Sequence, residues 1–88
     1  MEQIIKIENE NFSNHNQLEL IRRLLWLNDF CVYEYNQGYF SFLVDGEGLI
    51  IEFLENKQLI ITSYLSYKQF NKFYETLNSW LNSLEGNE

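Results

Sequence analysis

Two successive segments, residues 49–54 and 59–64, have apolar side chains in both alternations of a strand. One alternation holds Leu49, Ile51, Phe53, Leu59 and Ile61, and the other holds Ile50, Leu54, Ile60 and Tyr64. Successive side chains of a strand point to opposite faces, so a sheet built from these strands needs cover on both sides. Only two helices are predicted to supply that cover. Either the helices divide between the two faces, or a second molecule covers one of them.

Four strands with short connections are predicted between these helices, at residues 30–35, 39–44, 49–54 and 59–64. Asp45-Gly46 separates the second strand from the third and is a strong hairpin signal, because both residues accept positive φ. Short connections favour sequential antiparallel pairing, so the pattern predicts a four-stranded antiparallel meander. Residues 3–7 leave open a short additional strand at the N-terminus.

The first helix is predicted to begin near residues 14–16, where Asn side chains precede Gln or Glu by three positions. Its apolar stripe includes Leu18, Ile21, Leu24 and Leu25, and it is expected to end at Asn28-Asp29. On its polar side, Arg22 and Arg23 are expected to pair with Glu19. Recognition of a carboxylate or phosphate is the alternative use of these arginines.

The second helix is predicted to begin at Ser66, which forms a capping box with Gln69. Apolar side chains then recur at helical spacing as far as Leu84, and Gly86 is placed to end the helix. Residues 86–88 are expected to form a loose tail. The predicted fold class is therefore α+β, in a single domain of residues 1–88. One helix precedes the four-stranded meander in the sequence, and the other, longer helix follows it.

Composition narrows the class of protein. Of the 88 residues, 45% are hydrophobic and 17% are aromatic, which is too apolar for a disordered chain. No apolar run approaches the roughly 20 residues that span a bilayer, and no basic, apolar leader is present, so a cytoplasmic protein without membrane contact is expected. Thirteen acidic and six basic side chains give a net charge of −7, which argues against direct binding of nucleic acid.

Residues suited to catalysis are few and isolated. His15 lies in a polar, Asn-rich stretch and is expected on the surface, and Cys31 begins a strand and is expected to be a buried small hydrophobic residue. The segment Asp45-Gly46-Glu47-Gly48 lacks the alternating oxygen ligands of a calcium loop and is better explained as a hairpin. We therefore expect no enzyme, no metal site and no cofactor.

Aromatic residues are the better candidates for binding. Tyr and Trp combine apolar area with a polar tip and are enriched at interfaces. Tyr33 and Tyr35 are expected on one face of their strand, with Tyr39 facing the same way across the hairpin. The predicted partner-binding residues are Tyr33, Tyr35, Tyr39, Ile50, Leu54 and Tyr64.

The order of elements, with the small size and the acidity, resembles the type III secretion chaperones. The resemblance rests on residues 18–27, 40–64 and 70–84, and it is a resemblance of pattern that covers most of the chain. It implies a non-enzymatic protein that holds a segment of a client, commonly as a dimer. Those chaperones usually have a further helix between the third and fourth strands, for which residues 55–58 are too short.

Two functions follow as hypotheses. The first is a small acidic adaptor or chaperone-like protein that binds a protein partner on apolar sheet surface or at a sheet edge, with a homodimer as one way to cover that surface. The alternative is an acidic inhibitor, such as an immunity protein, antitoxin or phage anti-defence protein, that blocks a basic nucleic-acid-binding site. Its acidic patch would consist of Asp45, Glu47, Glu52 and Glu55. Binding that weakens steeply with salt would favour the inhibitor.

Overall fold

The predicted hairpins form, and their strands join in one antiparallel sheet. The computed structural model describes residues 2–85, and its sheet has the strand order β1-β5-β4-β3-β2. The strands are β1 (Gln3–Glu8), β2 (Phe30–Asn36), β3 (Tyr39–Val44), β4 (Glu47–Leu54) and β5 (Gln58–Ser63). The meander of β2 to β5 is confirmed, and β1 is a fifth strand that pairs with β5. The protein is therefore α+β with a five-stranded sheet.

The turn between β3 and β4 has the conformation that its residues predict. Asp45 has φ 54° and Gly46 has φ 80°, and the flanking residues Val44 and Glu47 are paired across the hairpin. A two-residue turn with positive φ at both positions matches the right-handed twist of the two strands. The local sequence therefore sets the register of this hairpin.

Helix α1 (Asn14–Leu25) begins within the predicted range of residues 14–16, but its cap is not an Asn. Its N-cap is Ser13, whose backbone is extended and whose Oγ accepts a 3.3 Å hydrogen bond from the backbone N–H of Asn16. The prediction of an Asn cap at residues 14–16 was wrong, because the Asn16 side chain instead donates to the carbonyl oxygen of Asn11 at 2.6 Å. The helix also ends at Leu25, before the predicted Asn28-Asp29.

Helix α2 (Tyr67–Leu84) begins after Ser66, as predicted. The Ser66 Oγ accepts a 3.5 Å hydrogen bond from the backbone N–H of Gln69, which is one half of the predicted capping box. The other half is replaced, because the Ser66 N–H donates to Glu47 of β4 at 2.8 Å and the Gln69 amide donates to Asp45 at 2.6 Å. The predicted helix end at Gly86 and the tail at residues 86–88 lie outside the described residues.

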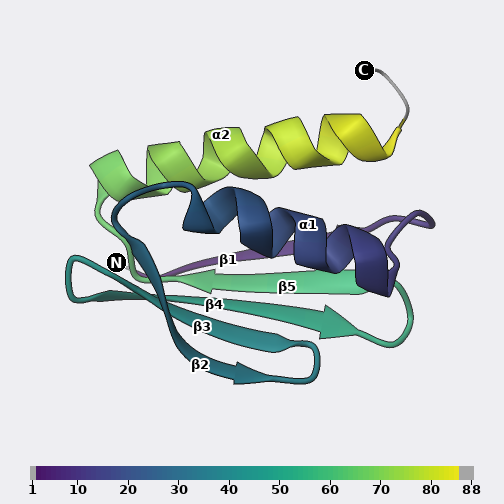
Figure 1. Cartoon of the computed structure of the whole chain (residues 1–88), viewed down its shortest axis with the longest axis horizontal. Coiled ribbons are helices and arrows are strands. Elements are labelled where there is room, and N and C mark those ends of the chain that lie inside the picture. Colours follow the sequence, from purple (N-terminus) through teal and green to yellow (C-terminus); the bar gives the residue numbers. More distant parts are fainter. Residues whose placement is uncertain (1, 86–88) are drawn as a thin grey trace.

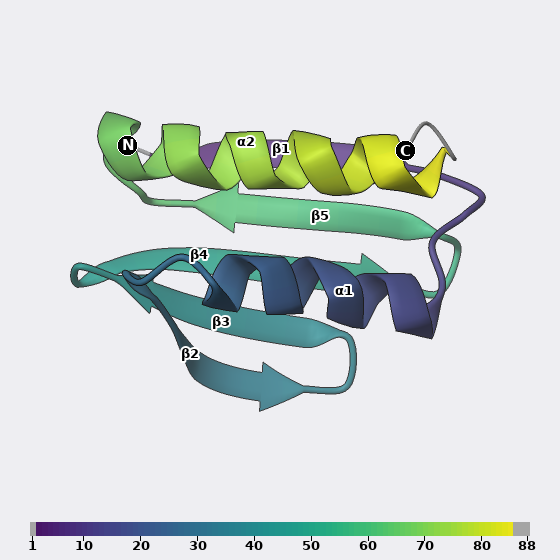
Figure 2. The ribbon, with the colours of Figure 1, turned by 45° about the horizontal axis from the view of Figure 1, so that its top comes forward.

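Both helices lie on the same face of the sheet, which we call the inner face (Figure 1). Figure 2 shows that α2 runs along β1 and β5 and that α1 lies over β3 and β4. The inward-pointing side chains of the three central strands are buried except for the half-buried Glu47, and the buried ones are Phe40, Phe42, Val44, Leu49, Ile51, Phe53, Leu59, Ile61 and Ser63. Of the two arrangements that the alternation allows, the helices adopt the one that leaves the other sheet face uncovered within residues 2–85.

Trp80 of α2 joins the two helices at the centre of the core. Its indole is fully buried, stacks on the ring of Phe12 at a centroid distance of 5.3 Å, and donates a 2.8 Å hydrogen bond from Nε1 to the carbonyl oxygen of Asn16. A buried indole N–H needs such a partner. Neither helix in the described part of the chain is long and apolar enough to cross a membrane.

Candidate protein-binding surfaces

The uncovered face of the sheet, which we call the outer face, carries apolar side chains on β1, β3, β4 and β5. In each strand these residues alternate with the buried ones, so they point away from the helices. They are Ile4 on β1, Tyr39 and Leu43 on β3, Ile50 and Leu54 on β4, Ile60 on β5, and Tyr64 at the end of β5. Four of them are exposed by more than a third: Ile4 (57%), Tyr64 (45%), Leu43 (41%) and Leu54 (38%). An apolar surface that extends over several strands is typical of an interaction site.

Four of the six predicted partner-binding residues lie on this outer face: Tyr39, Ile50, Leu54 and Tyr64. The expected common face of Tyr35 and Tyr39 was wrong. Tyr35 is paired with the buried Phe40 and therefore points to the inner side, whereas Tyr39 is paired with Asn36 and points outward. Tyr33 lies in an irregularity of the pairing between Val32 and Glu34, which is a β-bulge. A bulge adds a residue to one strand, so a strict alternation cannot place side chains on both sides of it.

Tyr64 is held at one end of the outer face. Its hydroxyl donates a 2.7 Å hydrogen bond to the carboxylate of Glu2, and that carboxylate raises the pKa of the Tyr64 hydroxyl above its ordinary value of 10.0. The ring lies beside Gly48, where a Cβ atom would be 3.7 Å from the Tyr64 Cδ2. The tyrosine therefore keeps one position on the face while remaining 45% exposed.

Strand β2 forms one edge of the sheet, and α1 does not cover it. Every residue from Cys31 to Asn36 is exposed, including Val32 and Tyr35, which point to the inner side of the sheet. The flank of α1 above this edge is also apolar, because Leu18 and Leu25, two helical turns apart, are 54% and 48% exposed. The predicted apolar stripe of α1 is therefore wider than the surface that the sheet buries.

A groove of about 510 Å³ lies between the beginning of α1 and the end of β2, and we call it the β2 groove. It is lined by Asn14, Gln17 and Leu18 of α1, by Tyr35 and Asn36 of β2, by Gln37 and Gly38 of the following turn, and by Phe40 of β3. The Tyr35 ring packs on the Phe40 ring at a centroid distance of 4.8 Å, so its position in the groove is set by the core. A second groove of about 460 Å³ shares four lining residues with the first and continues around the start of α1 toward Glu55 and Lys57.

The four acidic residues of the predicted patch do not come together. Asp45 and Glu47 lie at the turn between β3 and β4, where both accept hydrogen bonds from the start of α2. Glu55 lies beyond the opposite end of β4, and the eight residues of that strand separate its two ends by about 24 Å. Glu52 points to the outer face beside Tyr39 and Ile60. Asp45 and Glu47 thus stabilise the fold, and the other two acids stand apart from them.

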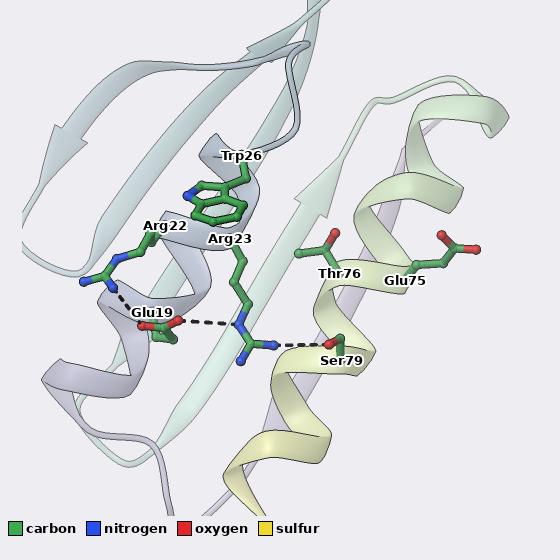
Figure 3. Close-up of a pocket in the computed structure, with 7 residues that line it drawn as sticks. All are labelled: Glu19, Arg22, Arg23, Trp26, Glu75, Thr76 and Ser79. Carbon is green, nitrogen blue, oxygen red and sulfur yellow. Dashed lines mark hydrogen bonds and ion pairs between the residues drawn. The ribbon is translucent and has the colours of Figure 1, made fainter. Parts of the chain in front are cut away.

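A third groove, of about 480 Å³, runs between the two helices on the side away from the sheet (Figure 3). Arg22 and Arg23 each form an ion pair of 3.6 Å with Glu19, as predicted, and Arg23 also donates a 3.2 Å hydrogen bond to Ser79 of α2. Trp26, the C-cap of α1, stands beside them and is 81% exposed. Trp26 is not among the binding residues predicted from the sequence. Its position outside the stripe of Leu18, Ile21, Leu24 and Leu25 is the signal that could have found it.

The two residues considered for nucleophilic chemistry are not brought together. His15 is exposed at the start of α1, as predicted, and Cys31 follows the other end of this helix, which is about 18 Å long. The prediction that Cys31 is buried was wrong: it is paired with Leu43, points to the outer face at the sheet edge and is exposed. Within residues 2–85, no group of three or more His, Cys, Asp or Glu side chains could hold a metal ion.

The chain was compared with protein families, curated proteins and solved structures. No family model, curated protein or solved structure matches it. The edge strand, the β2 groove and the outer face are therefore the observations from which its function is inferred.

Proposed function

We propose that this chain is a non-catalytic protein-binding module of the cytoplasm, an adaptor or chaperone-like protein, that holds an extended segment of a partner protein along β2. The observation that carries the proposal is that β2 is exposed from Cys31 to Asn36 and lies at an edge of the sheet beside a groove into which Leu18, Tyr35 and Phe40 bring apolar side chains among four amide side chains. An edge strand has a row of unpaired backbone N–H and C=O groups. A segment added to that edge gains backbone hydrogen bonds, and its alternate side chains enter the groove.

The opposite edge, β1, is less suited to strand addition. Lys6 and Glu8 stand exposed on this strand, two charges against the single Glu34 of β2, and charged side chains on an edge oppose pairing with another chain. The alternate residues Ile5 and Ile7 are partly buried against the core, on the side that α2 covers (Figure 2). An added strand would therefore find no free apolar surface on the helix side of β1.

The bulge in β2 divides this strand into two parts. Bulges interrupt a ladder of backbone hydrogen bonds, so a partner segment is expected to pair with the part that follows it, residues 34–36. This part lies next to the β2 groove, where Leu18 and Tyr35 present apolar side chains. Backbone pairing and side-chain recognition thus coincide over the same residues.

The proposal is tested by selecting binders from a library of random extended peptides displayed on phage and titrating the best one into the isotope-labelled chain. Binding is expected to protect the backbone amides of β2 from hydrogen exchange. Replacing Leu18 or Tyr35 by Glu is expected to weaken binding by about tenfold or more, which corresponds to about 1.4 kcal/mol. Tyr67→Glu is the matched control, because Tyr67 is 82% exposed on α2.

Two outcomes would count against the proposal. One is that selection yields no peptide whose binding depends on Leu18 or Tyr35. The other is that bound peptides leave the exchange of the β2 amides unchanged.

A further inference from the structure

We propose that the outer face is covered by a second copy of this chain, in a two-fold dimer that stacks the two sheets face to face. The axis of the dimer runs parallel to β4, the central strand of the sheet. This inference goes beyond the proposed function, because stacking covers a face of the sheet and leaves the edge of β2 free.

The size of the outer face matches what a dimer requires. Five strands spaced about 4.8 Å apart, with about six residues each at about 3.3 Å, give a flat area of about 24 by 20 Å. Two such faces together present about 1,000 Å², without the additional area of protruding side chains. Specific protein–protein interfaces bury a total surface of about this size or more. Stacked sheets pack about 10 Å apart through interdigitating apolar side chains, which the central strands supply here.

The strand order makes the face complementary to itself under this symmetry. An axis parallel to β4 places β5 of one copy over β3 of the other, and β1 over β2. By the register of the sheet, Ile60 then lies at the level of Tyr39, and Tyr64 lies at the level of Leu43. Ile50 of the central strand meets Ile50 of the second copy. Apolar residues thus oppose apolar residues across the centre of the face.

Charge selects this axis over the alternative that runs across the strands. Among the outward-pointing residues of the described strands, Lys6 on β1 is the only cation. By the register of the sheet it lies level with Asn36 of β2, and Glu34 is two residues away from Asn36 on the same strand. The parallel axis brings Lys6 of each copy to the Glu34 end of the other, and so makes two equivalent attractive pairs. An axis across the strands would place β1 over β1 and β2 over β2, so that Lys6 of one copy would not face Glu34 of the other.

The same axis makes one unfavourable contact, and this contact is diagnostic. Glu52 is half-buried on β4 between Tyr39 and Ile60, so the two copies of Glu52 face each other near the axis. Like charges in a partly buried interface oppose association. Removing this charge is therefore expected to strengthen the dimer, whereas most substitutions in an interface weaken it.

The dimer is tested on the full chain by sedimentation equilibrium from low micromolar to millimolar concentration. The wild type is expected to show twice the mass of one chain at high concentration. Glu52→Gln is expected to lower the dissociation constant by about threefold to tenfold, and Ile50→Lys to raise it by about 100-fold, which is about 2.7 kcal/mol. Tyr67→Lys on α2, an exposed position away from the outer face and from the β2 groove, is the matched control and is expected to leave the dissociation constant unchanged.

A second pair of variants tests the axis and avoids the half-buried Ile50. Leu43→Lys replaces a side chain that is already 41% exposed, so the fold is expected to tolerate it while the dimer dissociates. Lys6→Glu is expected to weaken the dimer, and adding Glu34→Lys in the same chain is expected to restore it. Circular dichroism of each variant establishes that it is folded.

Three results would overturn the inference: a monomer at every concentration, a dimer unaffected by Leu43→Lys and Ile50→Lys, or a dimer that Glu52→Gln weakens. Its failure is distinguishable from failure of the proposed function. A monomeric wild type that still binds a peptide at β2 would remove only the dimer. A dimer whose β2 edge binds no peptide would remove only the proposed function.

Discussion

The carboxylate of Glu47, at the start of β4, accepts a 2.8 Å hydrogen bond from the backbone N–H of Ser66, the residue that caps α2. The first N–H groups of a helix and those of its cap have no partner within the helix. A strand residue 19 positions earlier in the chain supplies one here. The contact fixes the start of α2 against the hairpin of β3 and β4. Glu47, one of the four residues of the predicted acidic patch, therefore has a structural role.

Replacing Glu47 by Ala is expected to destabilise the protein by about 1 kcal/mol, because the Ser66 N–H loses its acceptor. Glu47→Gln keeps an acceptor oxygen and is expected to lose less. Glu55→Ala, at the opposite end of β4, is the matched control. Urea unfolding followed by circular dichroism measures all three. An equal loss for the Glu47 and Glu55 variants would show that the contact is unimportant.

Replacing Trp80 by Phe is expected to cost about 2 kcal/mol or more, because the half-buried carbonyl oxygen of Asn16 loses the indole donor and the stack on Phe12 loses area. Trp26→Phe removes an indole that is 81% exposed and is expected to change the free energy of unfolding by less than about 0.5 kcal/mol. The free energies come from urea unfolding of each variant. The role assigned to Trp80 is wrong if both substitutions cost the same.

Asp29 is expected to make stability depend on acid pH. Its carboxylate accepts a 3.1 Å hydrogen bond from Lys72, and this bond, with the Gln69 side chain and the charge of Lys72, lowers the pKa of Asp29 below its ordinary value of 3.8. A carboxyl whose pKa is lower in the folded state stabilises the protein above the unfolded-state pKa, and this contribution is lost as the pH falls through the folded-state pKa.

This dependence is measured as the free energy of unfolding at a series of pH values from neutral to strongly acidic. The difference between wild type and Asp29→Asn is expected to be largest near neutral pH and to shrink below pH 3.8, the ordinary pKa of the group. Glu55→Gln is the control for general loss of negative charge. A difference that stays constant across the series would show that Asp29 does not titrate differently in the folded state.

Cys31 is expected to react with a thiol reagent in the folded protein, because its side chain is exposed at the sheet edge. The protein is kept at low concentration, so that it is not dimeric. Cys31→Ser is expected to change stability by less than about 0.5 kcal/mol, as is usual for a surface substitution. Labelling rates with and without urea give the comparison. Labelling only after unfolding would mean that the thiol is covered.

Local signals predicted most of the elements correctly. The boundaries of β3 follow from its alternation and flanking turns, and the start of α2 follows from Ser66 and Gln69. Interactions of the backbone with neighbouring side chains decide both features, so a short stretch of sequence contains the necessary information. The cap of α1 was missed because three residues, Ser13, Asn14 and Asn16, compete for it, and the contact with Asn11 decides among them.

The candidate surfaces could be predicted only in part. The alternation identified Ile50, Leu54 and Tyr64 as the apolar residues of a second face, and the structure places them together on the outer face. It could not identify the β2 groove, because residues of α1, β2 and β3 line this groove together, and the alternation indicates neither where α1 lies nor that β2 has a bulge. Neither is encoded in the period of a single strand.

The sequence by itself determined that this chain forms an α+β fold whose strands are apolar on both faces, since side-chain alternation and turn residues act locally. Only the tertiary structure decided that both helices pack on one face, that Tyr35 and Tyr39 point in opposite directions, and that Asp45 and Glu47 hold the start of α2. The sequence could not decide the placement of the helices, because an amphipathic helix buries its apolar stripe equally well on either apolar face of the sheet. Contacts between residues far apart in the chain, such as Trp80 with Asn16, join the two helices side by side.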